Sequence, residues 1–146
     1  HINLITKQFA NKKCIRYTQI KGSENLKEYD VLILDTIGIL MSAYRYGSWA
    51  YIGGGFNKSG IHNTLEAATF GLPVVFGPNY QTFLEANGLI KAEAGFGISS
   101  QDQLNAVFDM LLTNQNFRNQ AGAKSEAYVE QHLGATKAIL SSIIVN

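Results

Sequence analysis

The sequence from residue 50 to residue 79 reads AYIGGGFNKSGIHNTLEAATFGLPVVFGPN, and this stretch decides the fold class. It opens with a short apolar run, Ala50–Ile52, that passes directly into three glycines. A helical pattern follows from Ile61 to Phe70 and stops at Gly71, and a second apolar run, Pro73–Phe76, comes next. Short apolar strands connected through a glycine turn and a helix predict parallel strands that are buried on both faces.

The same alternation continues on both sides of this stretch. Before it we predict a helix over 2–12, a strand over 14–20, a doubly buried strand over 29–35, and a helix reaching about Tyr46 that Asp35 or Thr36 caps. After it we predict a helix over 80–90, a strand near 97–98, an amphipathic helix over 104–112, and a helical segment over 116–145. The fold class is therefore α/β, a Rossmann-like parallel sheet with helices on both faces and a ligand at the carboxyl ends of its strands.

Composition limits the kinds of function that the chain can have. Its 146 residues are 46% hydrophobic and 16% charged, which favours one well-buried domain over disorder. Twelve basic and eleven acidic residues give a net charge of +1 without a basic run, so nothing points to nucleic acid as a partner. Cys14, the lone cysteine, is predicted to be a buried apolar residue in a reducing compartment.

The ends of the chain suggest that it is a piece of a longer protein. It begins at His1 without an initiator Met and without a signal peptide, in what reads as the middle of a domain. No apolar run approaches the roughly 20 residues that span a bilayer. The C-terminal helix ends in an apolar group that either covers its own sheet or packs on another domain, namely Ile139, Leu140, Ile143 and Ile144.

Glycine turns and helix starts are predicted to gather at the carboxyl edge of the sheet, in segments 35–38, 53–56, 59–63 and 76–79. Helix starts leave backbone N–H groups unpaired, and glycines let a phosphate approach the backbone closely. The alternative is that the three glycines only form a tight turn. The Lys-Ser of a phosphate loop and a G-x-G-x-x-G fingerprint are both absent, which argues against an ATPase and an ordinary NAD-binding unit.

Helical spacing places His62, Asn63 and Glu66 on one face of the predicted helix. Glu66 is positioned to accept hydrogen bonds from ribose hydroxyls, or else it only favours the positive end of the helix dipole. Asn63 can donate to a phosphate or to a sugar. His62, at the helix start, is either a neutral hydrogen-bond donor or a structural residue.

Three segments, 51–56, 60–67 and 71–79, closely resemble the 3-deoxy-D-manno-octulosonic acid (Kdo) transferases, in particular their C-terminal domain. The likeness is strongest over 31–90, and Asp35–Gly38 also fits the family. The resemblance implies the GT-B fold, in which two Rossmann-like domains face each other across a cleft. Residues 1–146 would then be the C-terminal nucleotide-sugar-binding domain, without the N-terminal acceptor and catalytic domain.

The resemblance also implies a reaction, the inverting transfer of Kdo from CMP-Kdo to a lipid A precursor in lipopolysaccharide biosynthesis, with no cofactor and no bound metal. The full-length enzyme would work at the cytoplasmic face of the bacterial inner membrane and contact its surface, whereas this fragment would be soluble. The catalytic base is expected in the N-terminal domain. No catalytic residue is assigned here, and the fragment alone is predicted to be inactive.

The nucleotide-binding residues that the resemblance implies fall into three groups. Near the single phosphate would lie Gly54, Gly55, Ser59 and Gly60. Asn63 and Glu66 would hold the phosphate and ribose with His62 beside them, and the loop containing Thr36 and Gly38 would line the cytidine pocket. Ile39 stands where the family often has an acid, so it is given no polar role.

Two other functions stay open at this point. A GT-B enzyme with a UDP-sugar donor would need donors for two phosphates, and Lys58 is the only basic residue at the glycine turns. A non-catalytic Rossmann-like binding module is the second alternative. The grouping of His62, Asn63 and Glu66 on one face argues against that module.

Overall fold

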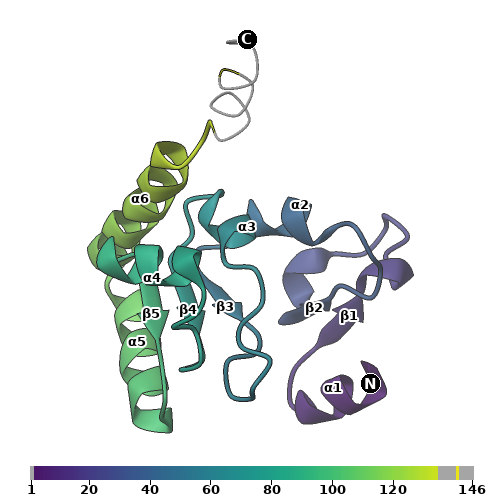
Figure 1. Ribbon diagram of the computed structural model, residues 1–146. Coiled ribbons are helices and arrows are strands. Elements are labelled where there is room, and N and C mark those ends of the chain that lie inside the picture. Colours follow the sequence, from purple (N-terminus) through teal and green to yellow (C-terminus); the bar gives the residue numbers. More distant parts are fainter. Residues whose placement is uncertain (1, 135–140, 142–146) are drawn as a thin grey trace. The chain divides into compact units, whose positions relative to one another are not determined.

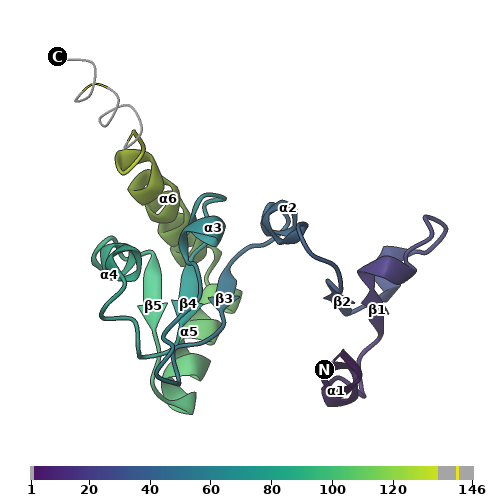
Figure 2. The same cartoon turned by 45° about the vertical axis from the view of Figure 1, so that its right-hand side comes forward.

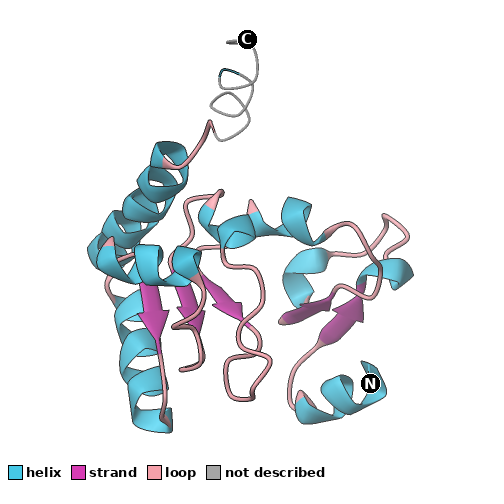
Figure 3. Cartoon of the chain, in the orientation of Figure 1, coloured by secondary structure: helices cyan, strands magenta, loops and turns pink. Residues whose placement is uncertain are grey.

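Parallel strands organise the chain. The computed structural model describes residues 2–134 and residue 141. The chain divides into two compact units, His1–Ala43 and Tyr44–Asn146, and each contains its own strand ladder. The first ladder has two strands and the second has three, in the order β3-β4-β5. The predicted fold class, α/β with parallel strands flanked by helices, is confirmed (Figures 1 and 3).

The elements of the first unit are shorter than the sequence predicts. They are α1 (Ile2–Gln8), β1 (Cys14–Arg16), two 3₁₀ turns (Tyr17–Gln19 and Leu26–Glu28), β2 (Val31–Ile33), and α2 (Leu40–Tyr44), which crosses the unit boundary. β1 and β2 pair in parallel, with Cys14 opposite Val31.

Three predictions for this unit are wrong in detail. The predicted strand over 14–20 stops at Arg16, because residues 17–19 coil into a 3₁₀ turn. β2 is not buried on both faces, since Leu32 is 50% exposed. Cys14 is half-buried rather than buried, and its Sγ lies 3.7 Å from the carbonyl oxygen of Lys12.

Asp35 ties the first unit together instead of capping a helix. Its carboxylate is enclosed and accepts hydrogen bonds from Thr18 Oγ1 at 2.7 Å, Thr18 N at 3.0 Å and Arg16 Nε at 2.7 Å. Because these donors already occupy the carboxylate, α2 begins only at Leu40, and neither Asp35 nor Thr36 caps it. The hydrogen bonds, that from the Thr18 hydroxyl above all, lower the pKa of Asp35 to about 2.

The depressed pKa of Asp35 predicts that the first unit loses stability in acid. A carboxyl group whose pKa falls on folding stabilises the native state above its unfolded pKa of about 3.9. That contribution is lost as the pH falls through about 2, the pKa in the folded protein. Thermal unfolding of the first unit, followed by the NMR signals of β1 and β2 between pH 2 and 6, should show this loss of stability. Asp35→Asn should make the stability less dependent on pH. An equal acid loss in the variant would contradict the assignment.

The second unit follows the predicted order of elements. These are β3 (Ala50–Ile52), α3 (Leu65–Ala68), β4 (Val74–Phe76), α4 (Leu84–Lys91), β5 (Gly95–Gly97), α5 (Gln101–Thr113) and α6 (Gln115–Gln131). The helix predicted over 61–70 is a single turn, for a reason given below. The apolar end predicted for the last helix, at Ile139, Leu140, Ile143 and Ile144, lies outside the described residues.

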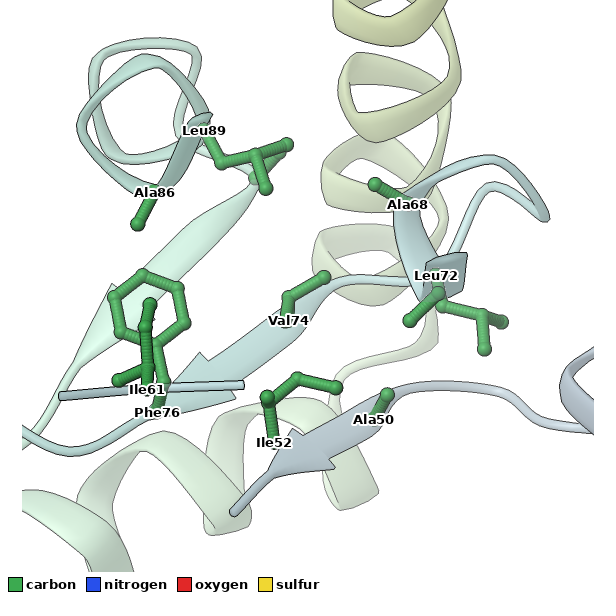
Figure 4. Packing of buried hydrophobic residues seen from close by; sticks show 11 residues of the cluster. Ala50, Ile52, Ile61, Ala68, Leu72, Val74, Phe76, Ala86 and Leu89 are labelled. Carbon is green, nitrogen blue, oxygen red and sulfur yellow. The ribbon is translucent and has the colours of Figure 1, made fainter. Parts of the chain in front are cut away.

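β4 lies at the centre of the three-stranded sheet, and all three of its side chains are fully buried. Val74 and Phe76 point into a core cluster with residues of β3, α3 and α4, including Ile52, Ala68 and Leu89 (Figure 4). Val75 points the other way, into a second cluster with Ile98 and Leu111 of α5. Helices therefore cover both faces, as predicted (Figure 2).

α6 fixes the turn that leads into β4. The buried Ser125 hydroxyl donates a hydrogen bond of 2.7 Å to the carbonyl oxygen of Leu72, immediately before β4. Gly71 has a φ of 66°, the left-handed conformation expected of a residue that ends a helix. These contacts position β4, and through it the loop at its carboxyl end.

Candidate functional site

The glycine segment after β3 forms a closed loop, here called the glycine loop (residues 53–60). Gly54, Gly55 and Gly60 have φ values of 87°, 82° and 75°, which residues with a side chain rarely adopt. The loop returns to pair Gly54 with Ile61 in an antiparallel bridge. Gly55 N–H donates to Gly60 O at 2.6 Å, and His62 N–H donates to Gly53 O at 3.1 Å. The glycines are therefore required by the backbone, whatever the loop binds.

The segment after β4 packs directly on the glycine loop. A Cβ at Gly55 would lie 2.8 Å from Gly77 Cα, so the two backbones touch where no side chain fits. Asn79 N–H donates to Gly55 O at 2.9 Å, and Asn79 Nδ2 donates to Asn57 O at 2.9 Å. These contacts confirm that segments 53–56, 59–63 and 76–79 meet at the carboxyl edge of this sheet.

The bridge at Ile61 moves the start of α3 to Leu65. Asn63 Oδ1 accepts a 3.0 Å hydrogen bond from Leu65 N–H, and Asn63 Nδ2 donates a 3.1 Å hydrogen bond to Glu66 Oε1. Asn63 and Glu66 are thus brought together as predicted. Contrary to the prediction from the sequence, His62 is not at the helix start, because its N–H pairs with Gly53 O and α3 begins only at Leu65.

Beside this pair lies a cavity of about 330 Å³, at the lower end of the range for small-molecule sites. It is lined by Ile61, His62, Asn63, Thr64, Leu65, Phe83 and Glu85. None of the described Lys or Arg residues lines it, and Glu85 contributes a carboxylate. Among the predicted residues, His62 and Asn63 line this cavity directly.

Sequence reasoning missed Phe83 and Glu85. Phe83 packs against Gly60, where a Cβ would lie 2.4 Å from the phenylalanine ring. This contact joins residues 23 positions apart across two loops, and no local pattern indicates it. Glu85 lies in the first turn of α4, where an acid is common for reasons of helix stability alone.

Glu66 also acts electrostatically on Tyr44, at the beginning of this unit. Burial raises the pKa of the Tyr44 hydroxyl, and the negative charge of Glu66 raises it further. Tyr44 packs against Phe70, with ring centroids 6.4 Å apart. One oxygen of Glu66 binds Asn63, which leaves its other oxygen for a ligand hydroxyl.

The remaining predicted residues are exposed at the surface. Ser59 lies in the glycine loop and is exposed, with its N–H donating to Asn57 Oδ1 at 3.0 Å. Thr36 and Gly38 belong to the first unit, where both are exposed, so their role at the nucleotide stays a prediction. Within residues 2–134 and 141, no three His, Cys, Asp or Glu side chains form a group that could hold a metal. In the same residues, no helix has the length and apolarity to cross a membrane.

The fold and the loop together define a Rossmann-like α/β domain with a candidate ligand site at the carboxyl edge of its three-stranded sheet. No family model matches the chain. Three curated relatives, each a 3-deoxy-D-manno-octulosonic acid transferase, are similar in sequence. The protein of Chlamydia trachomatis serovar D is 34% identical over 109 residues, covering 73% of this chain and 23% of the relative. That of Aquifex aeolicus is 39% identical over 87 residues, covering 56% and 23%. That of Bordetella pertussis is 32% identical over 116 residues, covering 78% and 27%.

Among solved structures, the chain is similar to the C-terminal CMP-Kdo binding domain of WaaA from Acinetobacter baumannii. The TM-score is 0.72 at 22% identity, and the match covers 87% of this chain and 66% of that one. This likeness shows a shared fold. The sequence is homologous to the Kdo transferases, as residues 51–79 predicted, although the chain spans only about a quarter of the length of these curated relatives.

Proposed function

We propose that this chain is the C-terminal donor-binding domain of a Kdo transferase, and that it binds CMP-Kdo at the glycine loop. The observation that carries the proposal is the arrangement of that loop beside the Asn63–Glu66 pair at the carboxyl edge of the sheet. The sequence relatives named as Kdo transferases and the fold of the CMP-Kdo binding domain support it.

The geometry favours a ligand with one phosphate. The left-handed glycines at 54, 55 and 60 shape the loop, and its exposed residues, 56–59, would receive the phosphate. One turn of helix offers unpaired N–H groups but only a small dipole. Within residues 2–134 and 141, no Lys or Arg lines the neighbouring cavity, so a second phosphate would find no cation from these residues there. Glu66 and Glu85 suit hydroxyl groups of the ribose or the sugar.

The remaining parts of the function belong to a longer enzyme. We propose that it transfers Kdo to a lipid A precursor in lipopolysaccharide biosynthesis, at the cytoplasmic face of the bacterial inner membrane. The acceptor site and the catalytic base are proposed to lie in a further, N-terminal domain of a GT-B pair. Thr36 and Gly38 are proposed to contact the cytidine, without a metal or a cofactor.

Calorimetric titration of the chain with CMP and UDP tests the donor class. We expect CMP to bind and UDP to bind at least tenfold more weakly. Tighter binding of UDP would favour a UDP-sugar enzyme. Binding of neither nucleotide would favour the non-catalytic module.

Replacing Glu66 with glutamine is expected to raise the Kd for CMP at least about tenfold, since a hydrogen bond to a charged group contributes about 1.5–3 kcal/mol. Repeating the titration with 2′,3′-dideoxy-CMP, which lacks the ribose hydroxyls, shows whether the loss comes from a contact between Glu66 and those hydroxyls. If Glu66 binds the ribose hydroxyls, this analogue should bind wild type weakly and lose little more in Glu66→Gln. Glu130→Gln, an exposed change on α6, is the control. Equal losses for CMP and its dideoxy analogue would refute the ribose contact.

A further inference from the structure

Asn79 connects two loops that the strands alone leave free to move apart. Its backbone N–H donates to Gly55 O at 2.9 Å, and its side-chain Nδ2 donates to Asn57 O at 2.9 Å. Both acceptors are backbone carbonyls of the glycine loop, one on each side of Phe56. Asn79 is the residue by which the segment after β4 holds this loop along its length.

The glycine loop needs such a restraint more than an ordinary loop does. Three glycines in left-handed conformations have the greatest backbone freedom to lose on ordering. The loop's own bridge, at Gly54 and Ile61, fixes its base. Its outer part, residues 56–59, is bound to the sheet edge by the Asn79 side chain through Asn57, while Phe56 is 58% exposed.

We propose that Asn79 is a positioning residue of the donor site, which orders the glycine loop before the ligand arrives. The inference rests on the proposed function, in that the loop receives the phosphate. An ordered loop presents its N–H groups without a further entropy cost on binding. Asn79 itself needs no contact with the ligand for this role.

The test compares Asn79→Leu, which keeps the approximate shape but removes the side-chain donor, with Asn79→His, whose ring can place an N–H at the equivalent δ position. In the ligand-free chain, hydrogen exchange of the Ser59 and Gly60 amides reports the order of the outer loop, because both donate to Asn57, the residue that the Asn79 side chain holds. We expect Asn79→Leu to speed this exchange and weaken CMP binding, each about tenfold. Asn79→His should restore both.

Asn114→Ala is the matched stability control, because Asn114 caps α6 and its side chain makes no contact with the glycine loop. It should lower the melting temperature without changing exchange at Ser59 and Gly60 or the affinity for CMP. Unchanged exchange at Ser59 and Gly60 in Asn79→Leu would overturn the proposal, as would a failure of histidine to rescue. If the wild-type chain does not bind CMP, the proposed function fails, and the exchange data still decide whether Asn79 orders the loop.

Discussion

Replacing Gly55 with alanine is expected to lower the free energy of unfolding of the second unit by about 3 kcal/mol or more. Gly55 has a φ of 82°, and a Cβ there would lie 2.8 Å from Gly77 Cα and 2.8 Å from Ile61 Cγ2. Strain and backbone crowding therefore add, and the main chain rather than a flexible side chain has to move. Urea unfolding measures the stability, and CMP titration should show that binding is lost.

Gly71→Ala is the matched control for this prediction. Gly71 also has a left-handed φ, 66°, but the nearest atom to an added Cβ lies 3.6 Å away, at ordinary contact distance. Its loss should be about 1 kcal/mol, from backbone strain alone. Equal losses in the two variants would show that the contact between Gly55 and Gly77 is not tight.

Replacing Phe76 with alanine is expected to cost about 3–5 kcal/mol of stability, the usual range for a fully buried aromatic residue. Phe76 is 0% exposed in the central strand and packs edge-on against Tyr80, with ring centroids 5.2 Å apart. The variant removes this packing and leaves a cavity at the end of β4 that carries the Gly77–Asn79 segment. Urea unfolding gives the magnitude.

Phe56→Ala makes the same chemical change where the ring is 58% exposed. It should change stability by less than about 1 kcal/mol. A small loss in Phe76→Ala, similar to that of Phe56→Ala, would mean that β4 is not the centre of the core.

The features that the sequence predicted well are those that local pattern determines. β3 occupies the predicted residues Ala50–Ile52, because a short apolar run before glycines has few alternatives. Asn63 and Glu66 meet as predicted, although Asn63 precedes α3 and is held there by the hydrogen bond that its Oδ1 accepts from Leu65 N–H. Segments 53–56, 59–63 and 76–79 meet as predicted because parallel strands end at one edge of their sheet. Segment 35–38, predicted to join them, belongs to the first unit.

The features that the sequence missed depend on contacts between distant residues. The segment 61–64 has helical spacing, but Ile61 pairs with Gly54 in a β-bridge instead. The helix therefore begins only at Leu65. Asp35 follows a strand as a cap would, yet Thr18 and Arg16 occupy its oxygens. Phe83 packs against Gly60 at the site, and the sequence around neither residue indicates this contact.

The glycine loop and the Asn63–Glu66 pair are proposed to bind a cytidine monophosphate. Amide NMR spectra of the chain, recorded during titration with CMP and separately with UDP, test this claim most directly. We expect CMP to shift the amides from Gly53 to Glu66 and that of Asn79, with little change in α5 and α6. Shifts in that loop with UDP but not with CMP, or CMP shifts confined to another surface, would contradict the claim.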